Sequence, residues 1–270
     1  MKKCLFVAVI AATVFAASAK AQFSIGVGYA NEKVISKTSV LDLGTGIKGY
    51  SWEKSRTHLD GFYVEASYDW EFTEMGPGVF TLQPGVRYTM LTSLISSTKS
   101  RASKDGEKYS ASSQSRYNNH LLDIPVNVKY SYDFVPGTVK AYVFAGPVLS
   151  LGLVANNVLD ETYNVLVNGK LEKQHVVETC NVYNGKYIVK TYNQETKKYD
   201  VEKQQDDLYK LYNAFDLKFG LGAGVTLCEE VDIKFGYNIG LLNRSFIKKD
   251  DLNKYSAHSN IMYFGVAYNF

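Results

Sequence analysis

The sequence predicts an all-β fold, an eight-stranded antiparallel up-and-down transmembrane β-barrel with long extracellular loops. Three observations lead to this prediction: segments in which apolar and polar residues alternate, a final segment that ends on an aromatic residue, and connections that alternate between long and short. Alternation with a period of two places successive side chains on opposite faces of a strand. The other two observations indicate which face meets lipid and which strand ends lie together.

Alternating segments predict the strands. In 61–72, Phe62, Val64 and Trp70 share one face, and Glu65 and Asp69 share the other. The same pattern recurs along the chain, although the fifth segment is ambiguous because its aromatic residues fall on the face that also carries a lysine and a serine. The predicted strands are 23–30, 61–72, 79–95, 120–134, 138–155, 212–228, 230–243 and 258–270.

In the last segment, the larger apolar side chains all lie on one face of the strand. They are Met262, Phe264, Val266, Tyr268 and Phe270. An exposed aromatic edge promotes aggregation of a soluble domain, whereas a closed barrel in lipid has an apolar outer face and no edge. This ending resembles the last strand of bacterial outer-membrane β-barrels. The resemblance implies that these five residues form the signal read by the barrel assembly machinery, which would be a partner during biogenesis.

The connections alternate in length. Those at 73–78, 135–137 and 229 are short, and those at 31–60, 96–119, 156–211 and 244–257 are long. Short periplasmic turns and long outer loops are typical of outer-membrane barrels. We therefore expect a bacterial outer-membrane protein with extracellular long loops and with both termini in the periplasm.

The first residues have the features of a secretory signal. Two lysines precede an apolar run over 5–17, and Ala19-Lys20-Ala21 offers the small residues that a signal peptidase requires. We expect residues 1–21 to be removed, which leaves 22–270 as the barrel domain. An uncleaved anchor is the alternative, but the run is short for a membrane span.

Charges of both signs lie on the face predicted to point inward. An eight-stranded barrel has an interior just wide enough for side chains, so we expect a packed network of ion pairs, with Glu65 or Asp69 near Arg87. A conducting pore or a proton path is the functional alternative. The predicted interior charges are Glu65, Asp69, Arg87, Lys129, Asp216, Lys218, Asp232 and Lys234.

A second resemblance covers a hairpin in the middle of the chain. Asp123-Ile124-Pro125 lies in one predicted strand, and aromatic residues precede Ala145-Gly146-Pro147 in the next. This hairpin resembles that of PorT-like outer-membrane barrels. The resemblance implies an eight-stranded outer-membrane barrel, and the namesake of the family is tied to protein secretion. The family supplies no catalytic motif.

Composition and spacing disfavour several other functions. Removing the three lysines of the signal from 30 basic residues leaves 27 against 27 acidic residues, so the charge balance gives no reason to expect a nucleic-acid partner. Cys180 and Cys228 are expected on opposite sides of the membrane, without a disulfide between them.

The histidines do not predict a metal or catalytic site. His58, His120 and His258 fall at strand ends, but in strands that are not neighbours, and His175 lies in the longest loop. Ser259 beside His258 cannot form a nucleophile–base pair readily, because adjacent strand residues face opposite ways. We expect no enzymatic activity, no cofactor and no metal.

The loops are therefore the predicted working parts. The 156–211 loop is too long for a simple connection, and its Asn-Gly pairs at 168–169 and 184–185 predict β-hairpins that extend the wall and expose Tyr183, Tyr187, Tyr192 and Tyr199 to a protein or glycan partner. The basic 96–119 loop is expected either to contact lipopolysaccharide or to be a solvated, flexible loop. The alternatives are narrow-channel transport, a component of a secretion complex, and a lipid-modifying enzyme.

Overall fold

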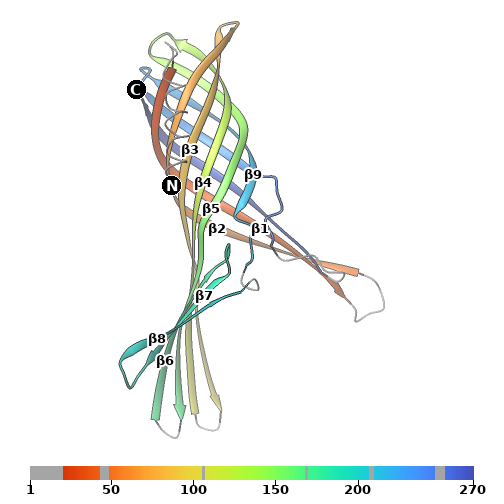
Figure 1. Cartoon of the computed structure of the whole chain (residues 1–270), viewed down its shortest axis with the longest axis vertical. Helices are drawn as coiled ribbons and strands as arrows, with labels where there is room; N and C mark the ends of the chain where they lie inside the picture. Colours follow the sequence, from red (N-terminus) through yellow and green to blue (C-terminus); the bar gives the residue numbers. More distant parts are fainter. Residues whose placement is uncertain (1–20, 43–48, 105–106, 168–169, 207–209, 247–252) are drawn as a thin grey trace.

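The computed structural model describes residues 21–42, 49–104, 107–167, 170–206, 210–246 and 253–270. Within these ranges the chain is all-β, and eight strands close into a ring because β1 pairs with β11 and β4 pairs with β5 (Figure 1). The predicted fold class is confirmed. The ring strands are β1 (Ala21–Asp42), β2 (Gly49–Met75), β3 (Gly78–Lys104), β4 (Glu107–Val135), β5 (Val139–Val167), β9 (Phe215–Leu227), β10 (Val231–Gly240) and β11 (Asn253–Asn269).

Three further strands follow β5 and form a small sheet beyond the barrel. They are β6 (Lys170–Asn181), β7 (Lys186–Asn193) and β8 (Lys198–Gln205), and they pair in series. This confirms the prediction that 156–211 forms hairpins. Gly185 has φ of 69° in the β6–β7 turn, a conformation that favours glycine. The Asn-Gly pair at 168–169 lies outside the described residues.

Two of the long connections predicted as loops are mostly strand. The β1–β2 ladder continues to Asp42 opposite Gly49, and the β3–β4 ladder continues to Lys104 opposite Glu107. The prediction of loops at 31–60 and 96–119 is therefore wrong. Ladder hydrogen bonds join backbone groups, so strands continue into water after the apolar alternation ends.

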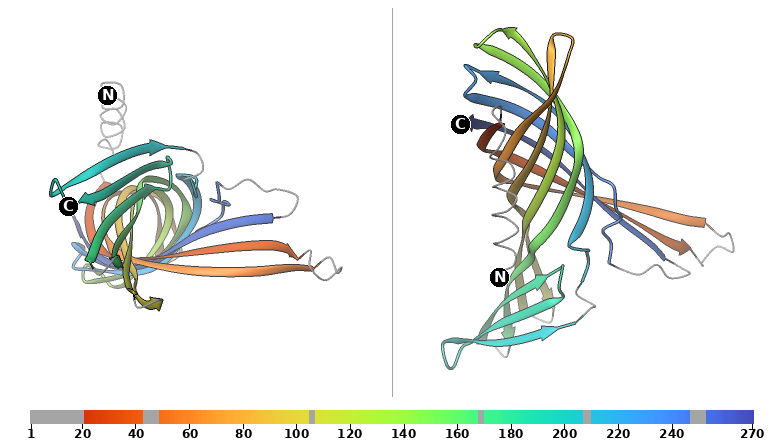
Figure 2. Two further views of the ribbon diagram at one scale, coloured as in Figure 1. Left: turned by 90° about the horizontal axis from the view of Figure 1, so that it is seen from below. Right: turned by 45° about the horizontal axis from the view of Figure 1, so that its top comes forward.

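The wall divides beyond the point where the β2–β3 ladder stops, at Asp60 opposite Thr92. One arm contains the β1–β2 hairpin and the start of β11, and the other contains the ends of β3, β4 and β5 with β6–β8. Figures 1 and 2 show these arms leaving the barrel in different directions. We call this the hairpin end of the barrel. The opposite, turn end carries the turns at 76–77, 136–138 and 228–230 and the described chain ends.

The outer face is apolar and the inner face is polar, as the alternation predicts. Phe62, Val64 and Trp70 are 52%, 43% and 45% exposed, whereas Glu65 and Arg87 are 3% and 2% exposed. In lipid, such an outer face buries against acyl chains. Among the described residues we find no helix with the length and apolarity that crossing a membrane requires.

The ambiguity of the fifth predicted strand is resolved by its neighbour. Tyr142 and Phe144 of β5 point inward, and Val143 points outward. Glycines in β9 make the space for these rings: a Cβ at Gly222 would lie 2.3 Å from the Phe144 ring, and one at Gly224 would lie 2.4 Å from the Tyr142 ring. The aromatic face of this strand therefore belongs to the interior.

Candidate functional site

The predicted ion pair in the barrel interior is present. A terminal nitrogen of the Arg87 guanidinium lies 2.5 Å from the Glu65 carboxylate, directly across the β2–β3 ladder, and Lys234 donates to the other oxygen of Glu65. Arg87 also lies over the ring of Tyr263, with 3.7 Å from its Cζ to the ring centroid. The glutamate is thus shared between two cations, and an aromatic face covers one of them.

A second ion cluster lies nearer the turn end. Lys129 Nζ is 2.8 Å from Asp69 and 3.9 Å from Asp232. Thr226 donates to Asp232 at 2.5 Å, and Gln83 donates to Asp69 at 2.6 Å. Each carboxylate therefore has both a cation and a neutral donor, which offsets the cost of removing it from water.

The third cluster is less completely bonded. Asp123, Ser150 and Asp216 face one another across β4, β5 and β9, and Lys218 Nζ lies 2.9 Å from Ser150 Oγ and 3.7 Å from Asp123. The carboxylate oxygens of both aspartates have no hydrogen-bond partner within the described part of the chain. All eight predicted interior charges thus lie inside the barrel, with Asp69 the least buried of them.

The hairpin end of the interior is closed by a cluster that sequence analysis missed. Glu32 is fully buried, accepts hydrogen bonds from Asn119 at 2.7 Å and from Ser259, and lies 3.6 Å from Arg244. Glu32 and Arg244 fall in the predicted loops 31–60 and 244–257, because apolar alternation stops before each of them. Strand continuation would have been the signal, since Glu32 keeps the inward parity of Ala30.

Tyr183 completes this closure. Its hydroxyl donates to Asn119 at 2.9 Å and accepts from Arg244 at 2.7 Å. The predicted exposure of Tyr183 is wrong, because the β6–β7 turn folds back over the barrel. The N–H of Val182 donates to Ala155 O at 2.9 Å and holds the turn there. Burial raises the pKa of Tyr183 to about 12. We call Asn181–Gly185 the cap.

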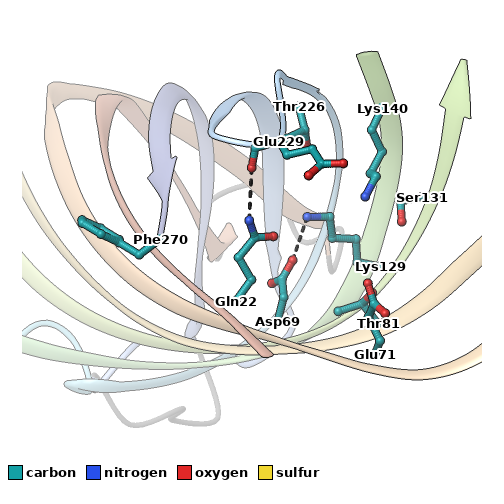
Figure 3. A pocket seen from close by; sticks show the side chains of 10 residues that line it. All are labelled: Gln22, Asp69, Glu71, Thr81, Lys129, Ser131, Lys140, Thr226, Glu229 and Phe270. Carbon is teal, nitrogen blue, oxygen red and sulfur yellow. Dashed lines mark hydrogen bonds and ion pairs between the residues drawn. The ribbon is translucent and has the colours of Figure 1, made fainter. Parts of the chain in front are cut away.

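A polar cavity opens at the turn end, as Figure 3 shows. It has a volume of about 430 Å³, and its walls carry Asp69, Glu71 and Glu229 together with Lys129 and Lys140. Lys129 is already paired with Asp69, and the Gln22 side chain donates to Glu229 O at 3.1 Å. Because acidic and basic side chains both line it, this cavity has no clear preference for a cation or an anion.

A second cavity lies outside the barrel on the small sheet of β5–β8. We call it the hairpin pocket; its volume is about 480 Å³. In its lining, His175 forms hydrogen bonds through both ring nitrogens: Nε2 lies 2.8 Å from Asp160 Oδ1, and Nδ1 lies 2.7 Å from Tyr199 Oη. The pocket is lined by Thr162, Lys173, His175, Tyr192, Gln194, Lys197 and Tyr199.

The aromatic residues of the pocket support one another. Tyr192 and Tyr199 are directly opposite across the β7–β8 ladder, with ring centroids 5.3 Å apart and an angle of 66° between the rings. Tyr199 is 43% exposed and Tyr192 is half-buried. Lys173 and Lys197 add positive charge. Such a surface can combine ring contacts with hydrogen bonds and with attraction for an anion.

The remaining predicted residues lie elsewhere. Tyr187 is half-buried in β7 opposite Cys180, and it does not line the hairpin pocket. His120 bonds Tyr88 at 2.5 Å on the outer face of the barrel. In the described ranges no group of three or more His, Cys, Asp or Glu residues is placed to hold a metal ion. Cys180 lies in β6 and Cys228 in a turn at the opposite end, and no disulfide joins them.

Comparison with known proteins places these features in a wider group. The family model described as "Outer membrane protein beta-barrel domain" matches residues 4–270. No curated protein matches the chain.

Solved structures of several small barrels are similar at low sequence identity. Ail of Yersinia pestis, solved in complex with the heparin analogue sucrose octasulfate, is 10% identical over 93% of this chain and 99% of its own, with a TM-score of 0.29. The outer membrane enzyme PagL is 10% identical over 92% and 98%, with a TM-score of 0.37. Neisserial surface protein A is 14% identical over 92% and 97%, with a TM-score of 0.29.

Proposed function

Because the chain belongs to the outer membrane protein beta-barrel domain family, we propose that it is a non-enzymatic outer-membrane protein that binds a glycan through the hairpins of 156–211. The hairpin pocket carries this proposal. Its volume of about 480 Å³ lies within the usual range for small-ligand sites, which is about 300–1,000 Å³.

The lining of the pocket favours an acidic sugar over a peptide strand. The Asp160–His175–Tyr199 chain fixes the orientation of an exposed tyrosine before any ligand arrives, which reduces the entropy lost on binding. Tyr192 and Tyr199 offer ring surface, Gln194 and Thr162 offer polar groups, and Lys173 and Lys197 suit a carboxylate or sulfate. Extracellular exposure of this arm is part of the proposal.

The closed interior supports binding over conduction. Ion clusters fill the barrel along its length, and the cap seals the hairpin end with Tyr183 and Arg244. A conducting barrel would require these pairs to separate, with a large cost for buried charges left without partners. Planar-bilayer recording of the purified protein provides the test, and a steady open-channel current would contradict this assignment.

A component of a secretion complex is the second candidate. The hairpin that resembles PorT-like barrels lies in β4 and β5, where Pro147 is exposed on the outer face and supplies no backbone N–H to the ladder. This exposed proline in the lipid-facing wall favours a site for a membrane partner. Pull-down from native outer membranes with Pro147→Ala as the comparison would test it, since loss of a partner in this variant alone favours the secretion assignment.

The primary test uses the full-length protein in detergent micelles on an array of neutral, carboxylated and sulfated glycans. We expect binding to acidic glycans, and we expect Tyr199→Ala and His175→Ala each to weaken it by about tenfold or more, because both remove part of a preorganised contact. Tyr187→Phe in the same sheet is the matched control and should bind normally. Binding that is equal in all four proteins would reject the pocket.

A further inference from the structure

Basic side chains gather on one face of the β1–β2 hairpin, away from the hairpin pocket. The β1–β2 and β1–β11 ladders of this arm contain no bulge, so every second residue of a strand lies on the same face. The outer face therefore consists of the odd positions of β1 and the even positions of β2, which continue the lipid-facing rows of Val27, Tyr29 and Phe62. We call this set the cationic patch. It consists of Lys33 and Lys37 of β1 with Lys54, Arg56 and His58 of β2.

Cross-strand pairing brings these side chains close together. Lys33 is directly opposite His58, and Lys37 is directly opposite Lys54, while Arg56 lies between these pairs opposite Ile35. Side chains that face each other across a ladder have Cβ atoms about 4.5–5.5 Å apart. On the β11 side, the outward neighbours are Asn260, His258 and Ser256, so that side adds no acidic residue.

Such an arrangement is unfavourable without an anion. Like charges directly opposite on a sheet destabilise it. The pKa of Lys54 is lowered, and the neighbouring charge of Arg56 is the largest cause, followed by burial and then by Lys37 and Lys33. The carboxylate next to the patch, Asp60, already accepts hydrogen bonds from Tyr29 and from Asn31, the latter at 2.8 Å.

The position of the patch indicates what the anion is attached to. Lys33 lies four positions beyond Tyr29, the last aromatic residue of the lipid-facing rows on β1, which corresponds to about 13 Å along a strand. Along the same outward face, the side chains therefore change from apolar to cationic within this distance, which matches the order of acyl chains and headgroup in a lipid. A molecule that follows this face needs acyl chains and phosphate groups in that order.

We propose that the outer face of the β1–β2–β11 arm binds a phosphorylated acylated glycolipid, with the acyl chains against the apolar rows and the phosphates against Lys33, Lys37, Lys54 and Arg56. This assigns the lipopolysaccharide contact to a different segment from the 96–119 region predicted from sequence. It is independent of the glycan proposed for the hairpin pocket, because the two sites are on separate arms.

The test is native mass spectrometry of the full-length protein reconstituted with bis-phosphorylated lipid A or with its dephosphorylated form. The variant is Lys37→Gln/Lys54→Gln/Arg56→Gln, and Lys190→Gln/Lys198→Gln/Lys203→Gln on exposed positions of the other arm is the charge-matched control. We expect the wild type and the control to retain the phosphorylated lipid, and the variant to retain it about a hundredfold less.

Two outcomes would overturn the proposal. One is equal retention of phosphorylated and dephosphorylated lipid A by the wild type, which would mean that acyl chains alone determine binding. The other is equal retention by the variant and the wild type. Gel mobility with and without heating confirms that each variant is folded, and normal glycan binding by the variant would keep this result separate from the hairpin pocket.

Discussion

Buried charges in this barrel depend on specific partners. Glu65 shows this best, since it is 3% exposed, lies against both Arg87 and Lys234, and occupies the inner face of a wall whose outer face is apolar. In water such a pair contributes little, whereas inside a narrow barrel the loss of one partner leaves a charge that nothing else can solvate.

We therefore predict that Glu65→Gln lowers the free energy of unfolding by about 3–5 kcal/mol, because it leaves Arg87 and Lys234 as two buried cations without the carboxylate that they share. Urea unfolding in detergent micelles, followed by tryptophan fluorescence, measures this loss. The double variant Glu65→Gln/Arg87→Met should recover part of it. Additive effects of the two substitutions would contradict an energetic coupling between these residues.

The raised pKa of Tyr183 predicts that the stability of the cap depends on pH. Its pKa is raised from 10 to about 12, chiefly by burial, so the folded cap binds this proton more tightly than the unfolded chain does. Its contribution to stability is present below pH 10 and is lost as the pH rises towards 12. The anisotropy of a fluorophore on Lys203→Cys should fall over this window. Tyr183→Phe cannot ionise, and it should show no step there.

At the scale of single strands, β11 is expected to act both in assembly of the barrel in cells and in stability of the folded protein, and these two roles can be measured separately. Phe270 ends the pattern predicted as an assembly signal, yet it is 68% exposed, and its closest polar contact is a backbone hydrogen bond to Phe23 O at 2.8 Å. The side chain thus contributes little burial within the folded chain itself.

Deletion of Phe270 should therefore reduce the amount of assembled protein in cells much more than it reduces stability after refolding in vitro. Immunoblotting of outer-membrane fractions measures assembly, and urea unfolding of refolded protein measures stability, for which we expect a change of about 1 kcal/mol or less. Phe264→Ala is a useful comparison within the same strand. Similar losses in both assays would argue for a structural role of the terminal residue.

The strands also show how far sequence can predict this fold. The eight-strand ring and its inside and outside faces follow from alternation, because lipid on one side and packed charges on the other impose it on residues such as Phe62 and Glu65. The extensions do not follow, because beyond Ala30 both faces of β1 carry polar side chains, such as Asn31, Glu32 and Lys33, so backbone pairing continues without an apolar period to detect.

The candidate sites were predictable only in part. The hairpin signals located the segment that carries Tyr192 and Tyr199, since Asn-Gly turns are determined by local chemistry. The contacts of Tyr183 were not predictable, because they depend on Arg244, which comes from a connection 61 residues away. The Asp160–His175–Tyr199 chain similarly requires the exact register of the four strands β5 to β8, and sequence gives register least reliably.

At the scale of the whole molecule, the two ends of the barrel are chemically distinct, and the family places the chain in the outer membrane. Cys228 is exposed in a turn at one end, and β8 is exposed along its length at the other. If the hairpin end is extracellular, a membrane-impermeant maleimide should distinguish these positions in intact cells.

We predict that Lys203→Cys, in a background with Cys180→Ser and Cys228→Ser, is labelled in intact cells. Cys228, in a background with Cys180→Ser, should be labelled only after the outer membrane is permeabilised. Burial raises the pKa of the Cys180 thiol, so this residue is a poor reporter of either side. Labelling of Cys228 in intact cells would reverse the orientation.

The cap has a practical consequence for engineering this protein as a display scaffold. Val182 and Tyr183 are seated on the barrel, so a foreign epitope inserted at Asn181–Gly185 would unseal the interior as well as change the surface. The tip at Glu195–Lys197 joins β7 to the exposed strand β8, and the backbone N–H groups of Glu195 and Thr196 donate to Asn193 within the same turn. Vaccine or biosensor designs should graft their peptides there, at the cost of the hairpin pocket but with the seal intact.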